Sequence, residues 1–278
     1  MNSMHINTSL YQHIDAIKTN SEALLRNFPE LHLAIESVSD LFDQLFVEQF
    51  QQNGEPWSSS VHKMIFASHS SWLQGIIMSS AGFNETGLIC VRRAIEYVCY
   101  SAKINNSNEK NIIWLDRGLN KNSDKLFSSK FSIPTKYFTP KYSSLKALLV
   151  WHDFASTFGA HGNFSTIVGK WDSATRDRLR MSFHDNPEGI PLSTGVAVRI
   201  GSFIVKAYYE IFTLYLKDAA TFKNNYDVSL DVINKARISV SKFSSHGNIS
   251  LEEVTAINSN EDPLIEEMYQ KLVEKYNV

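Results

Sequence analysis

The sequence has few of the residues that mark several common protein classes. Its 278 residues include only two cysteines, seven prolines and twelve glycines. Cys90 and Cys99 fall in one predicted helix with an axial rise of about 13 Å between them, which is too far for a disulfide. Two cysteines also do not make a structural zinc site. The scarcity of glycine and proline argues against an all-β fold, which needs many tight turns.

Long uncharged apolar runs are missing as well. The most apolar segment, residues 195–216, contains Arg199, Lys206 and Glu210, and these charges would be costly in hydrocarbon. Residues 1–11 lack the basic and then apolar pattern of a signal peptide. We therefore expect no membrane span and a cytoplasmic location.

No strong excess of one charge and no familiar cofactor signature is present. The formal net charge is −2, so any binding of nucleic acid has to come from a local patch. The chain has no Glu-x-x-His di-iron pattern, His-Glu-x-x-His motif, Walker A loop, dinucleotide glycine motif or Gly-x-Ser-x-Gly elbow. We predict no cofactor and no metal site.

Apolar residues recur with the period of a helix along nearly the whole chain, and no strand alternation is long enough for a sheet. We therefore predict an all-α, multi-helix bundle with a single domain over 1–278, an irregular basic insertion at 106–142 and an acidic helical tail at 250–278. Small residues in the third helix would let a neighbouring backbone approach closely. The predicted helices are 10–28, 29–53, 59–81, 84–105, 143–158, 172–183, 193–217, 229–243 and 263–276.

The predicted helix 84–105 combines an apolar surface on almost all sides with charges at its centre. Such a helix is typical of the middle of a bundle, with other helices around it. Arg92 and Glu96 are four residues apart and share one face, and Arg93 lies beside them. Because an unpaired buried ion is costly, they should pair with each other or with a polar group of another helix. Three interpretations stay open: a functional polar site, a structural ion pair, or a helix with one solvent-exposed face that carries both charges.

Several histidines are candidates for proton transfer. His161 follows the predicted helix 143–158, and an imidazole is well suited to acid–base chemistry near neutral pH. A histidine beside a glycine turn can equally bind the free carbonyls at the end of a helix. His62 and His69 share a helix face and could be reached by His152 in the fold. We interpret these three as polar residues of the core.

Two pieces of the chain resemble a known group of proteins. Residues 82–96 read GFNETGLICVRRAIE, and residues 157–161 read TFGAH. These are similar to segments of uncharacterised bacterial helical proteins in which a Gly, an Arg and a Glu recur on one helix and a Ser precedes a His at the end of a later one. Here Thr157 takes the place of that Ser. These proteins are related in architecture to the HEPN superfamily of helical toxins and phage-defence proteins.

The resemblance implies a HEPN-like bundle, commonly a homodimer with a cognate regulator protein, and in several members a metal-independent ribonuclease. Carried over to this chain, Arg92 would stabilise the phosphorane charge, Glu96 would orient Arg92, and His161 would act as general base or acid. The HEPN nuclease signature places an Arg a few residues before a His on one helix, and no Arg precedes His161 in this way. Arg92 would therefore have to reach His161 from another helix.

A basic segment provides the second indication of function. Between Arg117 and Lys146 the only acidic residue is Asp124, and aromatic residues are interleaved with the cations. Lysines for phosphates and aromatics for base stacking are what a single-stranded RNA surface needs. The alternatives are a solvated loop anchored by its aromatics, or a partner for the acidic tail. The candidate RNA-binding residues are Lys121, Lys125, Lys130, Lys136 and Lys141.

These patterns favour a bacterial anti-phage defence or toxin-type effector, with a metal-independent ribonuclease that acts on RNA as the candidate activity. The alternative from another class is a non-catalytic helical interaction or scaffold protein, in which the Arg92–Glu96 pair only specifies packing. A bundle that binds a small ligand such as a nucleotide around Arg92 is the remaining alternative.

Overall fold

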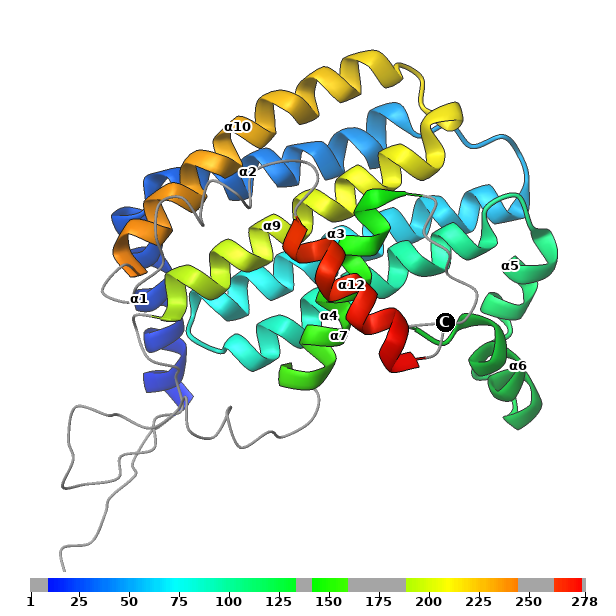
Figure 1. Cartoon of the computed structure of the whole chain (residues 1–278), viewed down its shortest axis with the longest axis horizontal. Coiled ribbons are helices and arrows are strands. Elements are labelled where there is room, and N and C mark those ends of the chain that lie inside the picture. Colours follow the sequence, from blue (N-terminus) through cyan, green and yellow to red (C-terminus); the bar gives the residue numbers. More distant parts are fainter. Residues whose placement is uncertain (1–9, 134–141, 160–188, 245–262, 277–278) are drawn as a thin grey trace, which may run out of the picture.

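A computed structural model describes residues 10–133, 142–159, 189–244 and 263–276, and Figure 1 shows their arrangement. Within these ranges the regular secondary structure is helical, apart from one isolated antiparallel bridge between Phe50 and Leu216. The predicted all-α, multi-helix fold is therefore confirmed. The helices are α1 Leu10–Asn27, α2 Pro29–Asp43, η1 Gln44–Gln49, α3 Pro56–Ser80, α4 Asn84–Ile104, α5 Asn108–Leu115, α6 Lys121–Phe131, α7 Ser143–Gly159, α9 Gly189–Phe212, η2 Thr213–Tyr215, α10 Ala219–Ser244 and α12 Pro263–Tyr276.

Several helices begin earlier than predicted. α3 begins at Pro56 and α9 includes Pro191 in its first turn, where proline has no N–H group to leave unpaired. α10 begins at Ala219 because the Asp218 carboxylate accepts a hydrogen bond of 2.9 Å from the backbone N–H of Thr221. The predicted helix 172–183 lies outside the described residues.

The prediction that 106–142 is irregular is wrong for 108–115 and 121–131, which form α5 and α6. The Ser107 side chain accepts from the backbone N–H of Lys110 and begins α5. At the start of α6, Asn120 and Ser123 bond to each other's backbone as a capping box. These caps stabilise two short helices whose apolar periodicity is weak.

The closest helix pair is α3 and α4, which make the most extensive contact in the described part of the bundle. Gly75 and Gly87 lie where the two backbones cross, and a Cβ atom on either glycine would be 3.1 Å from the carbonyl oxygen of the other. A Cβ atom on Gly87 would also overlap the Ser79 hydroxyl. The predicted close approach at small residues is therefore present.

α4 packs against α3, α5, α7 and α9, and its remaining face reaches the surface. Ile89 on this helix is 46% exposed, and Arg93 is exposed as well. The predicted enclosure of α4 on all sides is therefore not confirmed. α4 instead matches the alternative of a helix with one solvent-exposed face.

α9 joins several layers of the bundle. It contacts α2, α3, α4, α7 and α10, and the indole N–H of Trp72 on α3 donates a hydrogen bond of 2.8 Å to its Ala197 carbonyl. Residues 189–215 form a helix that could cross a membrane, judged by length and composition alone. However, 61% of its most apolar 18-residue stretch is buried inside the protein. The core helix of a soluble protein meets the same criterion.

Candidate functional site

Arg92 and Glu96 form the ion pair that their spacing predicts. The Arg92 Nε atom lies 3.1 Å from Glu96 Oε1, one turn further along α4. The Arg92 side chain is 31% exposed and the Glu96 side chain 25%. Solvent therefore reaches both charges although they belong to a helix of the core.

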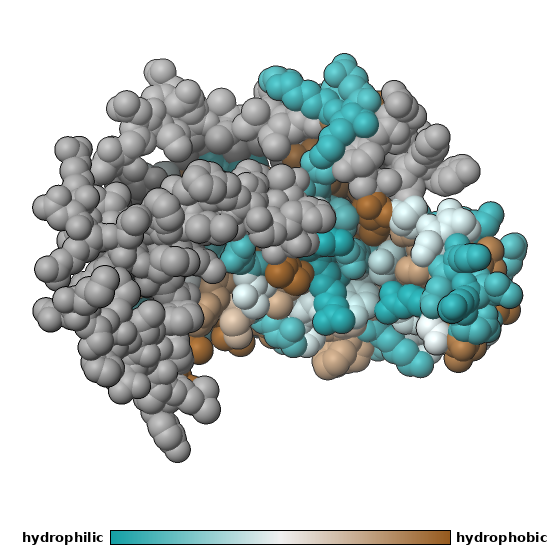
Figure 2. Space-filling model, turned by 90° about the horizontal axis from the view of Figure 1, so that it is seen from below, coloured by the Kyte–Doolittle hydropathy of each residue, from teal (hydrophilic) through white to brown (hydrophobic). Residues whose placement is uncertain are grey.

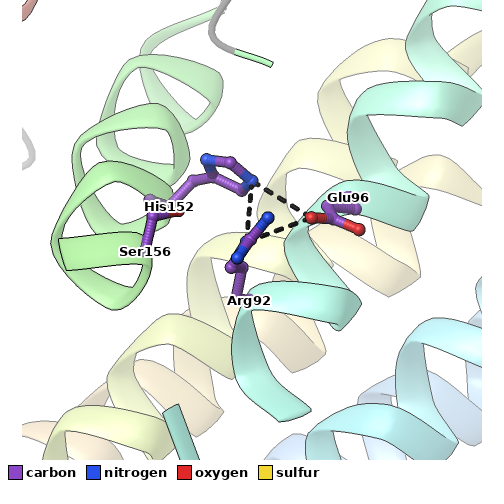
Figure 3. A network of polar contacts seen from close by, with 4 residues as sticks. All are labelled: Arg92, Glu96, His152 and Ser156. Carbon is purple, nitrogen blue, oxygen red and sulfur yellow. Dashed lines mark hydrogen bonds and ion pairs between the residues drawn. The ribbon is translucent and has the colours of Figure 1, made fainter. Parts of the chain in front are cut away.

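A third member of the cluster, His152, comes from α7 (Figure 3). Its Nε2 atom lies 3.3 Å from Glu96 Oε1 and 3.4 Å from Arg92 Nε. The imidazole is 4% exposed and closes the cluster from the inside. His152 does not share this site with the other two core histidines, because His69 bonds to Ser39 and His62 stacks on Phe46.

Two alternative hydrogen bonds meet at His152 Nε2. Arginine has only donors, and Arg92 Nε–H donates to His152 Nε2 at 3.4 Å while Arg92 Nε lies 3.1 Å from Glu96 Oε1. His152 Nε2 accepts from Arg92 in the tautomer with its proton on Nδ1, and donates to Glu96 Oε1 at 3.3 Å in the tautomer with its proton on Nε2.

Glu96 is the charged centre of this arrangement. Burial by itself would raise the pKa of Glu96, but the hydrogen bond and charge of His152, followed by those of Arg92, outweigh it and hold this pKa below its ordinary value. Glu96 is therefore ionised at neutral pH.

The far side of the imidazole has no partner. His152 Nδ1 is buried and accepts no hydrogen bond from any described residue. The Ser156 hydroxyl, one turn further on, donates instead to the His152 backbone carbonyl at 2.7 Å. Only Nε2 of this ring therefore bonds to other described residues.

His161, the predicted acid–base residue, lies outside the described residues, and so does its relation to Arg92. Sequence reasoning did not assign His152 to the site. A signal for it exists, because His152 is the polar residue on the buried α7 face that also carries Leu145, Leu148 and Ala155. A buried charged pair on α4 needs a polar partner on a neighbouring helix, and His152 occupies such a position.

Three of the five candidate RNA-binding lysines lie on α6, where Lys121, Lys125 and Lys130 are exposed. Lys136 and Lys141 lie outside the described residues. Hydrophilic surface predominates at the right-hand end of the molecule in Figure 2, where Figure 1 places α5 and α6. This part of the predicted basic surface is open to solvent.

The aromatics of α6 do not serve as base-stacking platforms. Phe131 is 1% exposed, and its ring packs at 5.7 Å against Tyr100 of α4. Phe127 stacks on Phe131 at 5.0 Å, and the Arg117 guanidinium covers it. The interpretation of these two rings as anchors to the core is therefore correct, and the stacking interpretation is wrong for them.

The acidic tail contacts the end of the basic segment. Lys146 Nζ lies 3.1 Å from Glu266 Oε2 and 5.2 Å from the Tyr269 ring, and Lys275 lies 2.9 Å from Asp153. α12 thus packs on α7, as Figure 1 shows. The predicted pairing between tail and basic segment holds for Lys146 and Glu266, while Glu267 pairs with Lys271 of its own helix.

Among the described residues, no group of three or more His, Cys, Asp and Glu side chains is placed to hold a metal ion. The chain was also compared with known families and proteins. No family model, no curated protein and no solved structure matches it. The resemblance to HEPN-related proteins therefore stays an expectation from residues 82–96 and 157–161.

Proposed function

We propose that the chain is a metal-independent ribonuclease of the bacterial defence or toxin type, with RNA as its substrate. The observation that carries the proposal is the convergence of a guanidinium, a carboxylate and an imidazole from α4 and α7 at a place that solvent reaches. These three groups supply positive charge for a phosphate and two sites for proton transfer.

Each group has a role in cleavage by the ribose 2′-hydroxyl. The terminal nitrogens of Arg92 bind the phosphate and stabilise the charge of the phosphorane. Glu96 is ionised and orients Arg92, and His152 holds Glu96 in place from behind. His161 keeps its predicted role as general base or acid: it takes the 2′-hydroxyl proton and passes it to the departing 5′-oxygen.

The exposed lysines of α6 extend the site into a binding surface. Arg92 is twelve residues before Ile104 at the end of α4, which is about 18 Å along the helix axis. α5 and α6 follow that end. Only a substrate of several nucleotides would contact both Arg92 and α6, so we propose single-stranded RNA rather than a mononucleotide as the ligand.

Expression in bacteria, followed by a gel of total RNA, tests the proposal. We expect growth arrest and RNA fragments with the wild type, and intact RNA with Arg92→Ala, Glu96→Gln and His161→Ala. Arg93→Ala is the matched control, because Arg93 is an exposed cation beside Arg92 and should leave the fragments unchanged. Intact RNA with the wild type, or fragments that persist in Arg92→Ala, would contradict the proposal.

A second function is favoured by the burial of His152. An imidazole that is 4% exposed is suited to specifying how α7 packs on α4, as in a non-catalytic interaction protein. In that case Arg92→Ala would lower the melting temperature and change no activity. The expected homodimer and cognate regulator remain proposals too, and light scattering on the purified chain tests the dimer.

A further inference from the structure

A second polar cluster lies between α2 and α3, and it shares no residue with the Arg92 site. The Ser39 hydroxyl lies 2.9 Å from His69 Nε2, and His69 Nδ1 lies 3.5 Å from Asp43 Oδ1. Ser39 and Asp43 are one turn apart on α2, and His69 reaches them from α3. The imidazole therefore joins a hydroxyl at one nitrogen to a carboxylate at the other.

The carboxylate selects the tautomer of the imidazole. A lone pair on Nδ1 would face Asp43 Oδ1 and be repelled, so Nδ1 carries the proton. Nε2 is then unprotonated and accepts the Ser39 O–H. This is the proton arrangement of a serine–histidine–aspartate triad, in which Nε2 is the base and the carboxylate holds the ring. The distance of 3.5 Å at Asp43 is long, as such contacts often are before a substrate binds.

Ser39 differs from five helical serines whose hydroxyls bond within their own helix. Ser80, Ser101, Ser129, Ser156 and Ser202 all donate to a carbonyl three or four residues earlier in their own helix. A serine bonded in this way is not activated, because its proton is held by a weak base. The Ser39 hydroxyl instead faces an imidazole.

The surroundings hold the imidazole in one orientation. Phe42 stacks on the His69 ring with centroids 4.8 Å apart, and Trp72 lies on α3 one turn away at 6.1 Å. Burial lowers the pKa of His69, and the charge of Asp43 acts in the opposite direction without cancelling it. The ring is therefore neutral near pH 7, as a general base must be. Asp43 itself is 64% exposed and Ser39 is half-buried, so the cluster opens to solvent.

We propose that Ser39 is a nucleophile that His69 and Asp43 activate, and that it is acylated by carboxylic esters with an apolar acyl group. Ser39 Oγ bonds to the acyl carbon while the bond from that carbon to the alcohol oxygen breaks. His69 Nε2 takes the serine proton and passes it to the departing alkoxide. Water then attacks the acyl-serine, and the products are the carboxylic acid and the restored hydroxyl.

Apolar side chains beside the cluster favour an apolar acyl group. Phe66 is on the same face of α3 as His69 and is 56% exposed, and its ring contacts Phe46 at 5.3 Å. Leu73, one turn beyond His69 on this face, is half-buried. An acyl chain on Ser39 can therefore lie along α3 against exposed hydrocarbon.

The position of Ser39 limits the expected turnover. Ser39 lies inside α2, where backbone N–H groups are already bonded within the helix and are not free to stabilise an oxyanion. We therefore expect the acyl-serine to form with activated esters and to hydrolyse slowly. A covalent adduct is the appropriate readout.

The experiment treats the full-length purified chain with a fluorophosphonate probe and with p-nitrophenyl butyrate, and locates adducts by peptide mass spectrometry. We expect labelling of Ser39, no labelling of Ser39→Ala, and at least about a tenfold slower reaction of Asp43→Asn and His69→Gln. Ser129→Ala is the control, because that exposed serine bonds to its own helix. Asp43 is exposed, so its replacement does not disturb the core.

Two results would overturn the proposal. One is the absence of an adduct at Ser39 in a protein whose circular dichroism and melting temperature show that it is folded. The other is labelling of Ser39 at an undiminished rate in Asp43→Asn and His69→Gln. Because the Arg92 site is intact in all these variants, the ribonuclease assay on the same samples separates the two proposals.

Discussion

At the scale of single residues, the candidate site depends on one oxygen atom. Glu96 Oε1 lies 3.1 Å from Arg92 Nε and 3.3 Å from His152 Nε2, so side chains from two helices surround one carboxylate oxygen. Removing the charge of Glu96 leaves the guanidinium, which donates to His152 Nε2 at 3.4 Å, without its anion. The network therefore serves both the packing of α7 on α4 and the proposed chemistry.

Glu96→Gln should lower the free energy of unfolding by about 1–2 kcal/mol at pH 7, because a hydrogen-bonded charge in a partly buried site is lost. The pKa of Glu96 is held below the ordinary value of 4.5, so its contribution is complete above that pH and is lost as the pH falls through the folded-state pKa. Urea denaturation between pH 3 and pH 7 measures the difference. A gap between wild type and variant that stays constant down to pH 3 would contradict this account.

The Arg92–Glu96 pair could be predicted from sequence because the spacing of four residues places both side chains on one helix face. His152 could be recognised from sequence as a polar residue on a buried helix face, but not as the partner of Glu96, since their distance depends on how α7 packs on α4. The triad-like contact of Ser39, Asp43 and His69 depends in the same way on the packing of α2 on α3. Local spacing predicts pairs within a helix, and only the tertiary structure provides partners between helices.

At the scale of elements, the α3–α4 crossing is the most restrictive contact. Gly87→Ala should lower the free energy of unfolding by about 1–3 kcal/mol, because the new methyl group meets the Gly75 carbonyl and the Ser79 side chain and backbone. Thermal unfolding followed by circular dichroism measures the change.

Gly195→Ala on α9 is the control for this prediction. A Cβ atom there meets only Val240, at 3.8 Å, and alanine favours a helix over glycine by about 0.5–1 kcal/mol. This variant should be neutral or more stable. If both variants shift the melting temperature equally, the crossing does not restrict residue size as described.

α12 lies on the outside of the described bundle and packs mainly on α7. Tyr269 and Leu272 are the buried anchors of this helix. Leu272→Ala should reduce the opening free energy of α12 by about 2 kcal/mol and speed amide hydrogen exchange there, with α3 and α4 unchanged. Lys271→Ala, which removes an exposed side chain of the same helix, should leave the exchange as it is. Faster exchange throughout the bundle would instead show that α12 supports the whole core.

The beginnings of helices were harder to predict than their existence. Apolar periodicity predicts the long helices, but α5, α6 and the first turns of α10 have little of it. Side-chain caps at Ser107, Asn120 and Asp218 begin these helices instead. A capping residue in a polar segment is therefore a better signal for such short helices than hydrophobic spacing.

At the scale of the whole molecule, the all-α fold followed from composition and periodicity, whereas the arrangement of the helices did not. The buried apolar residues form one core that extends from α1 to α12. α9, rather than α4 alone, connects its layers. Periodicity shows which face of a helix is buried, but it does not indicate which helix lies against that face.

The distribution of charge over the molecule leads to a prediction for RNA binding. Lys121→Ala with Lys125→Ala should weaken binding of single-stranded RNA and reduce the slope of log K against log salt by about 1.4, because each lost phosphate contact contributes about 0.7. Fluorescence anisotropy at several salt concentrations measures the slope. Lys18→Ala on α1 is the control, since Lys18 is 72% exposed and pairs with Glu22. An unchanged slope in the double variant would remove α6 from the proposed surface.

The most direct test of the account is cleavage of labelled single-stranded RNA by the purified chain in the presence of EDTA, under single-turnover conditions. The account predicts cleavage by the wild type and by Arg93→Ala, and a loss of at least about a hundredfold in Arg92→Ala and Glu96→Gln. No cleavage by a folded wild-type protein, or equal rates in Arg92→Ala and Arg93→Ala, would contradict the claim that the Arg92–Glu96–His152 cluster acts on RNA.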